Sequence, residues 1–314
     1  MDQLSPIHGG DYSHDLLLHE GDDELLEGTR AFVEQGLASG GKVLVHGTPE
    51  RVAMMRSSLD SHPRLDFGLD RDLYTSPSST LFAYQRMMAE SPEPVELWAT
   101  GTVPLGDDPA GHPAWARYES AVNASLRPYA FHGLCTYDTR TLPAATIAAA
   151  KATHPCLSTG GRRTLSPDYQ DPADFLANPV AAIPDPPVAR PVAMATLGSP
   201  MDLSGARHLL KASAESSSAL ARDTIDAFVS AVNEVLVNGL EHGGTRVSLT
   251  VWAEMSRLTC LVTDTGPGNT DPLSGYGYPA SAGPRGLWMA RQLCEDIFIS
   301  DQPGAGCRVL LTTV

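Results

Sequence analysis

Short apolar runs alternate with longer stretches of helical periodicity over the first 170 residues of the chain. Apolar runs of about four to eight residues are typical of β-strands, whereas apolar positions spaced by three and four indicate amphipathic helices. We expect strands at residues 16–19, 42–47, 95–100 and 131–137, and helices at 24–39, 49–60, 79–90 and 113–126. This alternation predicts an α/β domain with a doubly wound, mostly parallel sheet and helices on both of its faces.

The pattern changes in the last third of the chain. An amphipathic stretch covers residues 203–214, an alternating apolar run covers 258–263, and a further helix is expected over 287–295. The two patterns therefore predict two domains of different architecture.

A proline-rich segment separates the two patterns. Five prolines occur between positions 179 and 191, and such a segment is extended and semi-rigid. We therefore predict domains at 1–176 and 196–314, joined by a linker at 177–195.

Composition agrees with two globular domains. The 314 residues are 42% hydrophobic and 19% charged, with a net charge of −15. Residues 196–314 hold 8 Lys and Arg against 12 Asp and Glu, a net charge of −4, and the rest holds 14 against 25, a net charge of −11. This acidity argues against duplex DNA or an anionic membrane as a direct partner, and leaves a basic protein partner compatible.

The N-terminal segment lacks a basic region followed by an apolar core, and no run of about eighteen apolar residues occurs. We therefore expect a cytoplasmic protein. The cysteines are odd in number and never spaced as Cys-x-x-Cys, so reduced, mostly buried thiols are expected. They are Cys135, Cys156, Cys260, Cys294 and Cys307.

Three polar residues repeat every fourth position in segment 233–243. If the segment is helical, Glu234, Asn238 and His242 share one face. Asn238 suits Mg²⁺, which takes only one or two protein oxygens besides waters and substrate phosphates. Glu234 could then orient or deprotonate an attacking group. His242 is equally well explained as a cation at a helix C-terminus or as a ligand of a nucleotide or partner.

Two glycine-rich segments follow. Asp264 ends the alternating run, where its carboxylate could accept a hydrogen bond from an exocyclic amine such as that of adenine, and Gly266 and Gly268 allow close backbone approach. Near residue 286, Arg285 and Gly286 precede a helix opened by Leu287, and a helix N-terminus suits a phosphate.

These segments together resemble the ATP-binding domain of the GHKL superfamily, specifically the anti-sigma-factor serine kinases. Residues 233–238 resemble its N box, 264–268 its G1 box, 283–287 its G2 box, and 304–311 its last glycine turn and strand. The resemblance implies a C-terminal α+β sandwich of the Bergerat type that binds ATP and Mg²⁺.

The resemblance also assigns roles to single residues. Glu234 would be the general base, Asn238 the Mg²⁺ ligand and Asp264 the adenine contact. The lid and phosphate contacts would be Gly266, Gly268, Arg285 and Gly286. Pro267 and Pro284 depart from the pattern, and either could slow nucleotide exchange without abolishing binding.

The implied partners are a sigma factor and a STAS-type anti-sigma antagonist phosphorylated on Ser or Thr, and the resemblance favours a homodimer. A catalytically inactive, nucleotide-dependent protein-binding module is the main alternative. A histidine-kinase remnant is a third, which the short interval from Gly268 to Gly286 and the lack of paired dimerisation helices argue against. His208 is best explained as an ordinary residue on a helix surface.

The first 170 residues resemble the MEDS sensory domain, which is distantly similar to RecA-like ATPases. The residues that carry this resemblance are His8, 21–26, 32–45, Arg117, Tyr118, Glu119, Asn123, 134–138, 153–155 and 166–169. The resemblance implies ligand sensing but names no ligand. No Gly-x-x-x-x-Gly-Lys-Ser/Thr motif occurs, so ATP hydrolysis by this domain is not expected.

Polar residues at strand ends are the candidates for a ligand site in such a sheet. They are Glu119, Tyr137, Asp138 and His154. Helix caps, turns and buried hydrogen bonds explain the same positions. A metal site at His8, His14 and His19 is disfavoured, because their spacing suits neither one helix face nor one strand face.

Overall fold

The computed structural model forms two compact units. It describes residues 12–91, 95–105, 112–177, 185–244, 246–266, 271–278, 285–302 and 306–313. The first unit comprises Met1–Thr75 and Thr80–Phe175, and the second comprises Ser76–Ser79 and Leu176–Val314. Residues 178–184 of the expected linker lie outside the described residues, and the domain limits given above remain predictions.

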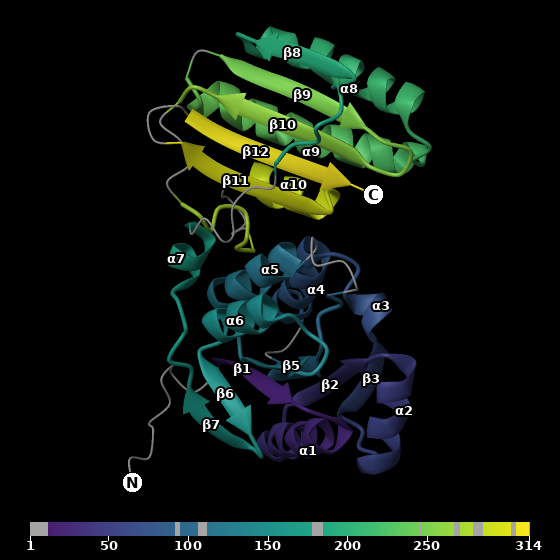
Figure 1. The fold of residues 1–314 in the computed structure, drawn as a ribbon, viewed down its shortest axis with the longest axis vertical. Coiled ribbons are helices and arrows are strands. Elements are labelled where there is room, and N and C mark those ends of the chain that lie inside the picture. The colour runs from purple at the N-terminus through teal and green to yellow at the C-terminus, as the bar shows by residue number, and fades with distance from the viewer. Residues whose placement is uncertain are drawn as a thin grey trace. The chain divides into compact units, whose positions relative to one another are not determined.

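The first unit is built on a seven-stranded mixed sheet (Figure 1). Its strands are β1 Tyr12–His19, β2 Lys42–Gly47, β3 Leu65–Leu69, β4 Leu97–Gly101, β5 Phe131–Asp138, β6 Cys156–Thr159 and β7 Arg162–Leu165. Their order is β3-β2-β4-β5-β1-β6-β7, with parallel pairing throughout except between β6 and β7. The predicted mostly parallel sheet is confirmed, with three short strands that the apolar pattern did not indicate.

Helices cover both faces of this sheet, as expected for a doubly wound fold. The helices of residues 22–177 are α1 Asp22–Ser39, α2 Pro49–Ser58, α3 Asp70–Leu73, α4 Pro77–Ala89, α5 His112–Ser125, α6 Ala144–Thr153 and α7 Pro172–Ala177. Figure 1 shows α1 and α2 on one face and α4, α5 and α6 on the other.

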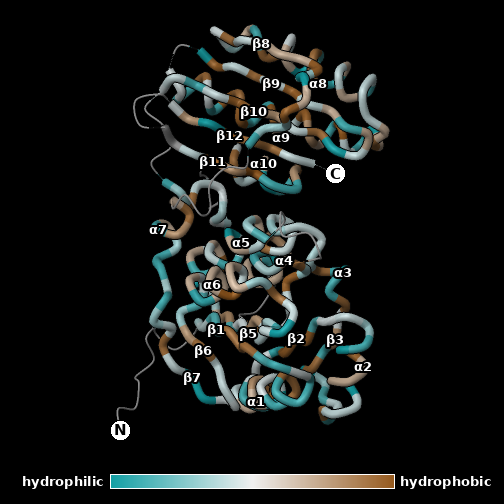
Figure 2. The backbone as a smooth tube through the Cα atoms, viewed as in Figure 1, coloured by the Kyte–Doolittle hydropathy of each residue, from teal (hydrophilic) through white to brown (hydrophobic). Residues whose placement is uncertain are grey.

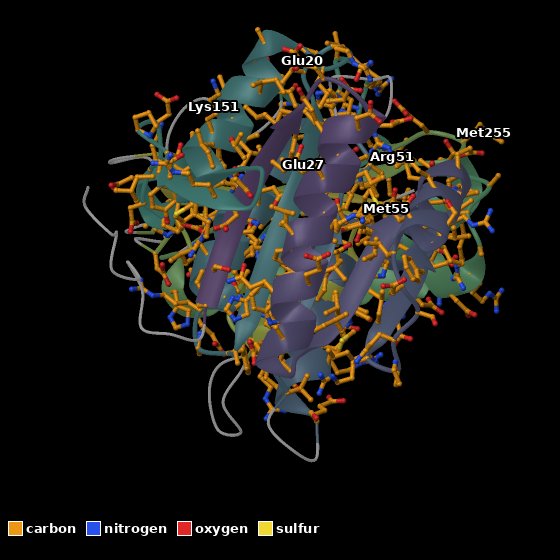
Figure 3. The ribbon with its side chains drawn as sticks, turned by 90° about the horizontal axis from the view of Figure 1, so that it is seen from below. Glu20, Glu27, Arg51, Met55, Lys151 and Met255 are labelled. Atoms are coloured by element: carbon orange, nitrogen blue, oxygen red, sulfur yellow. The ribbon has the colours of Figure 1, made fainter. Side chains whose placement is uncertain are left out.

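Strand alternation separates an apolar face from a more polar one. On β1, Leu17 packs against α1 so closely that a Cβ at Gly28 would lie 2.5 Å from its Cδ2 atom. Because successive side chains point to opposite sides of a strand, His14 faces the helices α5 and α6 instead. The face under α1 and α2 holds an apolar core that includes Met55, seen beside Arg51 in the view of Figure 3.

The second unit is a two-layer α+β sandwich. Its sheet has the order β11-β12-β10-β9-β8, and every adjacent pair is antiparallel. The strands are β8 Ala193–Leu197, β9 Val247–Ala253, β10 Leu258–Asp264, β11 Asp296–Gln302 and β12 Gly306–Thr313. The helices are the 3₁₀ turn η3 Pro200–Asp202, α8 Leu203–Ser217, α9 Arg222–His242 and α10 Gly286–Leu293. The predicted C-terminal architecture is confirmed.

Helix α9 lies at the centre of this second core. Its buried residues include Ile225, Phe228, Val232 and Val235, spaced by three and four, so one stripe of the helix faces the sheet. Phe228 is fully buried. Figure 2 shows hydrophobic residues along the strands β10 and β12 of this sheet.

The five cysteines are free thiols, four buried and Cys135 half-buried, as their number and spacing predict. Among the residues that the structure describes, no helix is both long and apolar enough to cross a membrane.

The buried His46 predicts a pH dependence of stability. It lies on β2, where a Cβ at Gly68 would come within 2.7 Å of its ring. Burial lowers the pKa of His46 to about 4. Since this folded-state pKa lies below that of an unfolded histidine, the unfolded chain takes up a proton first as the pH falls. The free energy of unfolding should therefore fall as the pH is lowered from about 6.5 toward 4.

The substitution His46→Gln should reduce this slope by about 1.4 kcal/mol per pH unit, measured by chemical denaturation across that pH range. An unchanged slope in His46→Gln would contradict the assignment.

Candidate functional site

A pocket of about 380 Å³ opens in the second unit beside α9. Its lining comes from α9, the end of β10, the turn before α10, the start of α10, and strands β11 and β12. The lining residues are Val235, Asn238, Gly239, His242, Gly243, Val262, Asp264, Ser274, Gly275, Gly286, Leu287, Trp288, Ile299, Cys307 and Val309. Five of the residues predicted from the sequence are among them: Asn238, His242, Asp264, Gly286 and Leu287.

Helix α9 brings two polar side chains to the start of α10. Glu234 and Asn238 are half-buried and one helical turn apart, as the sequence spacing predicts. A Cβ at Gly286 would lie 3.0 Å from Glu234 Oε2 and 3.5 Å from the Asn238 amide oxygen. Within the described part of the chain, neither side chain has a hydrogen-bond partner. Both are therefore available to a ligand at the N-terminus of α10.

Asp264 occupies the end of β10 on another wall of the pocket. Its Oδ1 atom accepts hydrogen bonds from the backbone N–H groups of Gly266 at 2.9 Å and Cys307 at 3.4 Å. These two bonds fix the carboxylate, and Oδ2 has no partner among the described residues. Oδ2 can thus accept a hydrogen bond from a ligand amine.

Close backbone packing holds this wall in place. A Cβ at Gly243 would lie 2.5 Å from Asp264 Cγ, and a Cβ at Gly306 would overlap the Asp264 carbonyl oxygen. Gly306 also has a φ of 96°, in the region that glycine adopts without strain. Thr265 donates its backbone N–H to Gly243 at 3.1 Å, which ties the end of α9 to the end of β10.

His242 lines the pocket at its rim, and the predicted residues Arg285 and Gly266 are outside the lining. His242 ends α9 with its side chain 78% exposed and 3.9 Å from Glu241. Arg285 is exposed directly before α10, outside the described lining. Gly266 packs against Gly243. Gly268, expected as a lid or phosphate contact, and the two departures Pro267 and Pro284 lie outside the described residues.

The buried Arg291 lies beside the pocket and was not predicted from the sequence pattern. Arg291 on α10 is 3% exposed, and its Nε donates to the Ser274 carbonyl at 3.2 Å while Nη1 donates to the Ile297 carbonyl at 3.0 Å. Its guanidinium also lies 3.8 Å from the centre of the Tyr276 ring. Arg291 therefore fixes the turn that carries Ser274 and Gly275 into the pocket.

In the first unit, three of the four strand-end candidates meet. The carboxylate of Glu119 on α5 contacts both Tyr137 on β5 and His154 after α6. Asp138 is not part of this group. Asp138 binds Arg140 at 2.7 Å, and this hydrogen bond lowers the pKa of Asp138 to about 2. Asp138 is therefore part of a loop ion pair.

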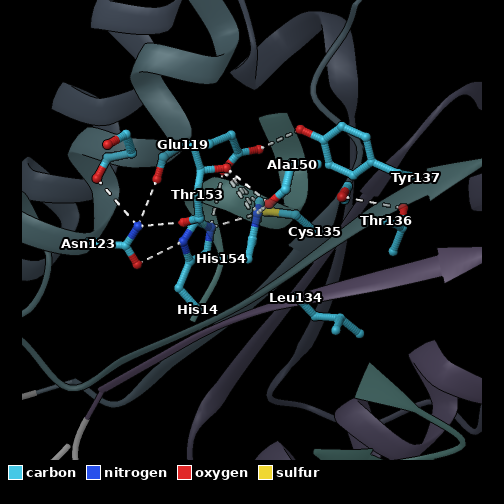
Figure 4. Close-up of polar contacts among 12 residues, drawn as sticks. His14, Glu119, Asn123, Leu134, Cys135, Thr136, Tyr137, Ala150, Thr153 and His154 are labelled. Atoms are coloured by element: carbon cyan, nitrogen blue, oxygen red, sulfur yellow. Dashed lines mark hydrogen bonds and ion pairs between the residues drawn. The ribbon is translucent and has the colours of Figure 1, made fainter. Parts of the chain in front are cut away.

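Two further residues complete the group around Glu119. We call His14, Glu119, Cys135 and His154 the buried polar cluster (Figure 4). Of the histidines considered for a metal site, His14 belongs to it. His19 is five positions further along β1, on the opposite face, and His8 lies outside the described residues.

Burial and the mutual contacts of the cluster shift the pKa values of His154 and Glu119 by different amounts. Burial lowers the pKa of His154 to about 3. Burial alone would raise the pKa of Glu119, but hydrogen bonding and the charges of the neighbouring histidines bring it below its usual range.

Two family models match the chain. Residues 13–155 match the model described as MEDS, the MEthanogen/methylotroph, DcmR Sensory domain. Residues 198–313 match the model described as the histidine kinase-like ATPase domain. The chain is thus a sensory domain fused to an ATPase domain of the GHKL type, a class that binds ATP with Mg²⁺ in general. No curated protein matches it. The resemblance to both domain families is confirmed, and the narrower relation to anti-sigma-factor kinases remains a prediction.

The close contact at Gly306 predicts a local stability effect. Gly306→Ala should lower the free energy of unfolding of the C-terminal domain by at least about 2 kcal/mol, because the new methyl group meets the Asp264 carbonyl and φ is positive. Gly205→Ala on α8 is the control, since a methyl group at that position would have no atom within 4 Å, and it should stabilise by about 0.5–1 kcal/mol. Urea denaturation of both variants checks this, and equal midpoints would contradict it.

Proposed function

We propose that this chain is a signalling regulator in which the MEDS domain controls an ATP·Mg²⁺-binding domain that acts on a protein partner. The two family matches support the pairing of a sensor with an ATPase domain. The observation that carries the proposal is the convergence of Glu234 and Asn238 on Gly286, with Asp264 on another wall of the same pocket.

Each of these residues has a role that its surroundings support. Asp264 is held by two backbone N–H groups and offers Oδ2 to the exocyclic amine of adenine. The N-terminus of α10 at Gly286 suits the phosphates through its backbone N–H groups and dipole. Asn238 lies beside Gly286 and would hold Mg²⁺, which offsets phosphate charge when bound.

Glu234 is the residue placed for proton transfer. Its carboxylate is one turn from Asn238 and adjacent to the same helix start. In a kinase reaction it would take the proton of a Ser or Thr hydroxyl, whose oxygen then bonds to the γ-phosphorus as ADP leaves. Arg285, exposed at the N-terminus of α10, is the candidate for a charge-assisted contact with the phosphates.

The partners belong to the same proposal. A STAS-type antagonist would be the phosphorylated protein, and a sigma factor would be the protein that is held and released, with the chain acting as a homodimer. The alternative is a nucleotide-dependent clamp that binds its partner without phosphate transfer.

Magnesium-dependent nucleotide binding tests the pocket. Asn238→Ala in the full-length chain should weaken Mg·ATP binding at least tenfold and remove most of its magnesium dependence, measured by isothermal titration calorimetry. Asn233→Ala is a matched control on the same helix, because Asn233 is occupied by a hydrogen bond from Arg207 at 2.9 Å. Its affinity should stay within about twofold of the wild type. Equal effects of the two substitutions would remove Asn238 from the site.

Glu234→Gln separates a kinase from a clamp. It should keep Mg·ATP affinity within about threefold and lower the rate of ADP formation at least 10²-fold, the usual contribution of a general base. Glu241→Gln, an exposed position on the same helix, should change neither quantity. If the wild type binds Mg·ATP but forms no ADP, with or without partner, the clamp is the correct function.

A further inference from the structure

Four potential metal ligands converge in the first unit from four separate places in the chain. His14 comes from β1, Glu119 from α5, Cys135 from β5 and His154 from the residue after α6. One ligand atom from each lies within 4.8 Å of all the others. His14, Glu119 and His154 are almost fully buried, and Cys135 is half-buried.

Four of the six separations among these ligand atoms are close to the edges of a tetrahedron, and all six are within 4.8 Å. His14 Nε2 lies 3.1 Å from Glu119 Oε2 and 3.3 Å from Cys135 Sγ. Glu119 Oε2 lies 3.5 Å from Cys135 Sγ and 3.6 Å from His154 Nε2. A tetrahedral Zn²⁺ ion at about 2.0–2.3 Å from its ligands would separate them by about 3.3–3.6 Å.

The outer nitrogen of each histidine is held by an acceptor. His154 Nδ1 lies 2.7 Å from the Ala150 carbonyl, which can only accept, so this nitrogen carries the proton. The Asn123 amide nitrogen lies within hydrogen-bond distance of three backbone carbonyls, so its Oδ1 is the atom that faces His14 Nδ1 at 3.2 Å. In both rings the Nε2 lone pair therefore points at the cluster centre, as in histidines that bind metal.

Two independent observations indicate that the buried polar cluster binds a cation. His154 Nε2 is fully buried and has no hydrogen-bond partner in the described structure. Tyr137 donates its hydroxyl to Glu119 Oε1 at 3.2 Å, which leaves Oε2 as the oxygen that faces the histidines. Two imidazole lone pairs and a carboxylate oxygen thus face one another, an arrangement that a cation stabilises.

We infer that the buried polar cluster is a tetrahedral transition-metal site of the sensory domain, with Zn²⁺ as its ion. Two imidazoles, one thiolate and one carboxylate form a donor set that selects Zn²⁺ over Mg²⁺ or Ca²⁺, which prefer oxygen ligands alone. On binding, the Cys135 sulfur bonds to the metal and its proton is released to solvent. The site is separate from the nucleotide pocket and does not depend on the proposed kinase activity.

Metal content and cobalt spectroscopy test the site. Full-length, tag-free protein purified without chelator should contain about one equivalent of zinc per chain by inductively coupled plasma mass spectrometry. After exchange into Co²⁺, the protein should show a thiolate-to-cobalt charge-transfer band and the intense visible bands of tetrahedral cobalt.

Cys135→Ser should abolish the charge-transfer band with little change in side-chain volume. Cys156→Ser is the matched control, since Cys156 is buried on β6, which pairs with β1, and lies outside the cluster, and it should keep the band. His154→Gln should lower zinc affinity at least tenfold, which a competing chromophoric chelator measures. Circular dichroism verifies that each variant is folded.

Folded wild-type protein with less than about a tenth of an equivalent of metal, and without cobalt bands after Co²⁺ addition, would overturn the inference. The four residues would then share protons in a closed hydrogen-bond network. A charge-transfer band that survives Cys135→Ser but disappears in Cys156→Ser would equally exclude the assignment.

Discussion

The C-terminal pocket depends on one close backbone contact, where the end of α9 meets the end of β10 and the start of β12. Gly243 and Gly306 lie against Asp264 with no space for a side chain. The backbone N–H groups of Gly266 and Cys307 then fix the carboxylate from two directions. The position of Glu234 and Asn238 follows from the same contact, because both belong to the helix that ends there. Geometry at a single junction thus sets the distance between the two sides of the pocket.

The part of this site that could be predicted from the sequence obeys short-range rules. Glu234 and Asn238 share a face because a helix repeats every 3.6 residues, and Asp264 lies at a strand end because the apolar run stops there. Arg291 escaped prediction for the opposite reason. A lone arginine in an amphipathic helix looks solvated, and only the turn and the strand that pack against it make it buried.

The buried polar cluster could not be predicted from such short-range rules. His14 and Cys135 are 121 residues apart, and they meet because β1 pairs with β5 in parallel register and both side chains point to the same face. The order of the strands, which decides which of them pair, is not visible in a local pattern. Spacing within one element argued against a metal site at His8, His14 and His19, and the structure places His19 on the other face of β1 from His14. The ligands of a site built across a sheet come from different elements, so this test could not find them.

Arg291 gives the pocket a mechanical link to the edge of its sheet. A planar guanidinium holds the carbonyl of Ser274 on one side and that of Ile297, in the edge strand β11, on the other. Because the guanidinium group is rigid, the turn at Ser274 and the strand β11 must move together or lose these hydrogen bonds. A ligand that displaces the turn at Ser274 would therefore also displace β11, outside the lining of the pocket contributed by α9.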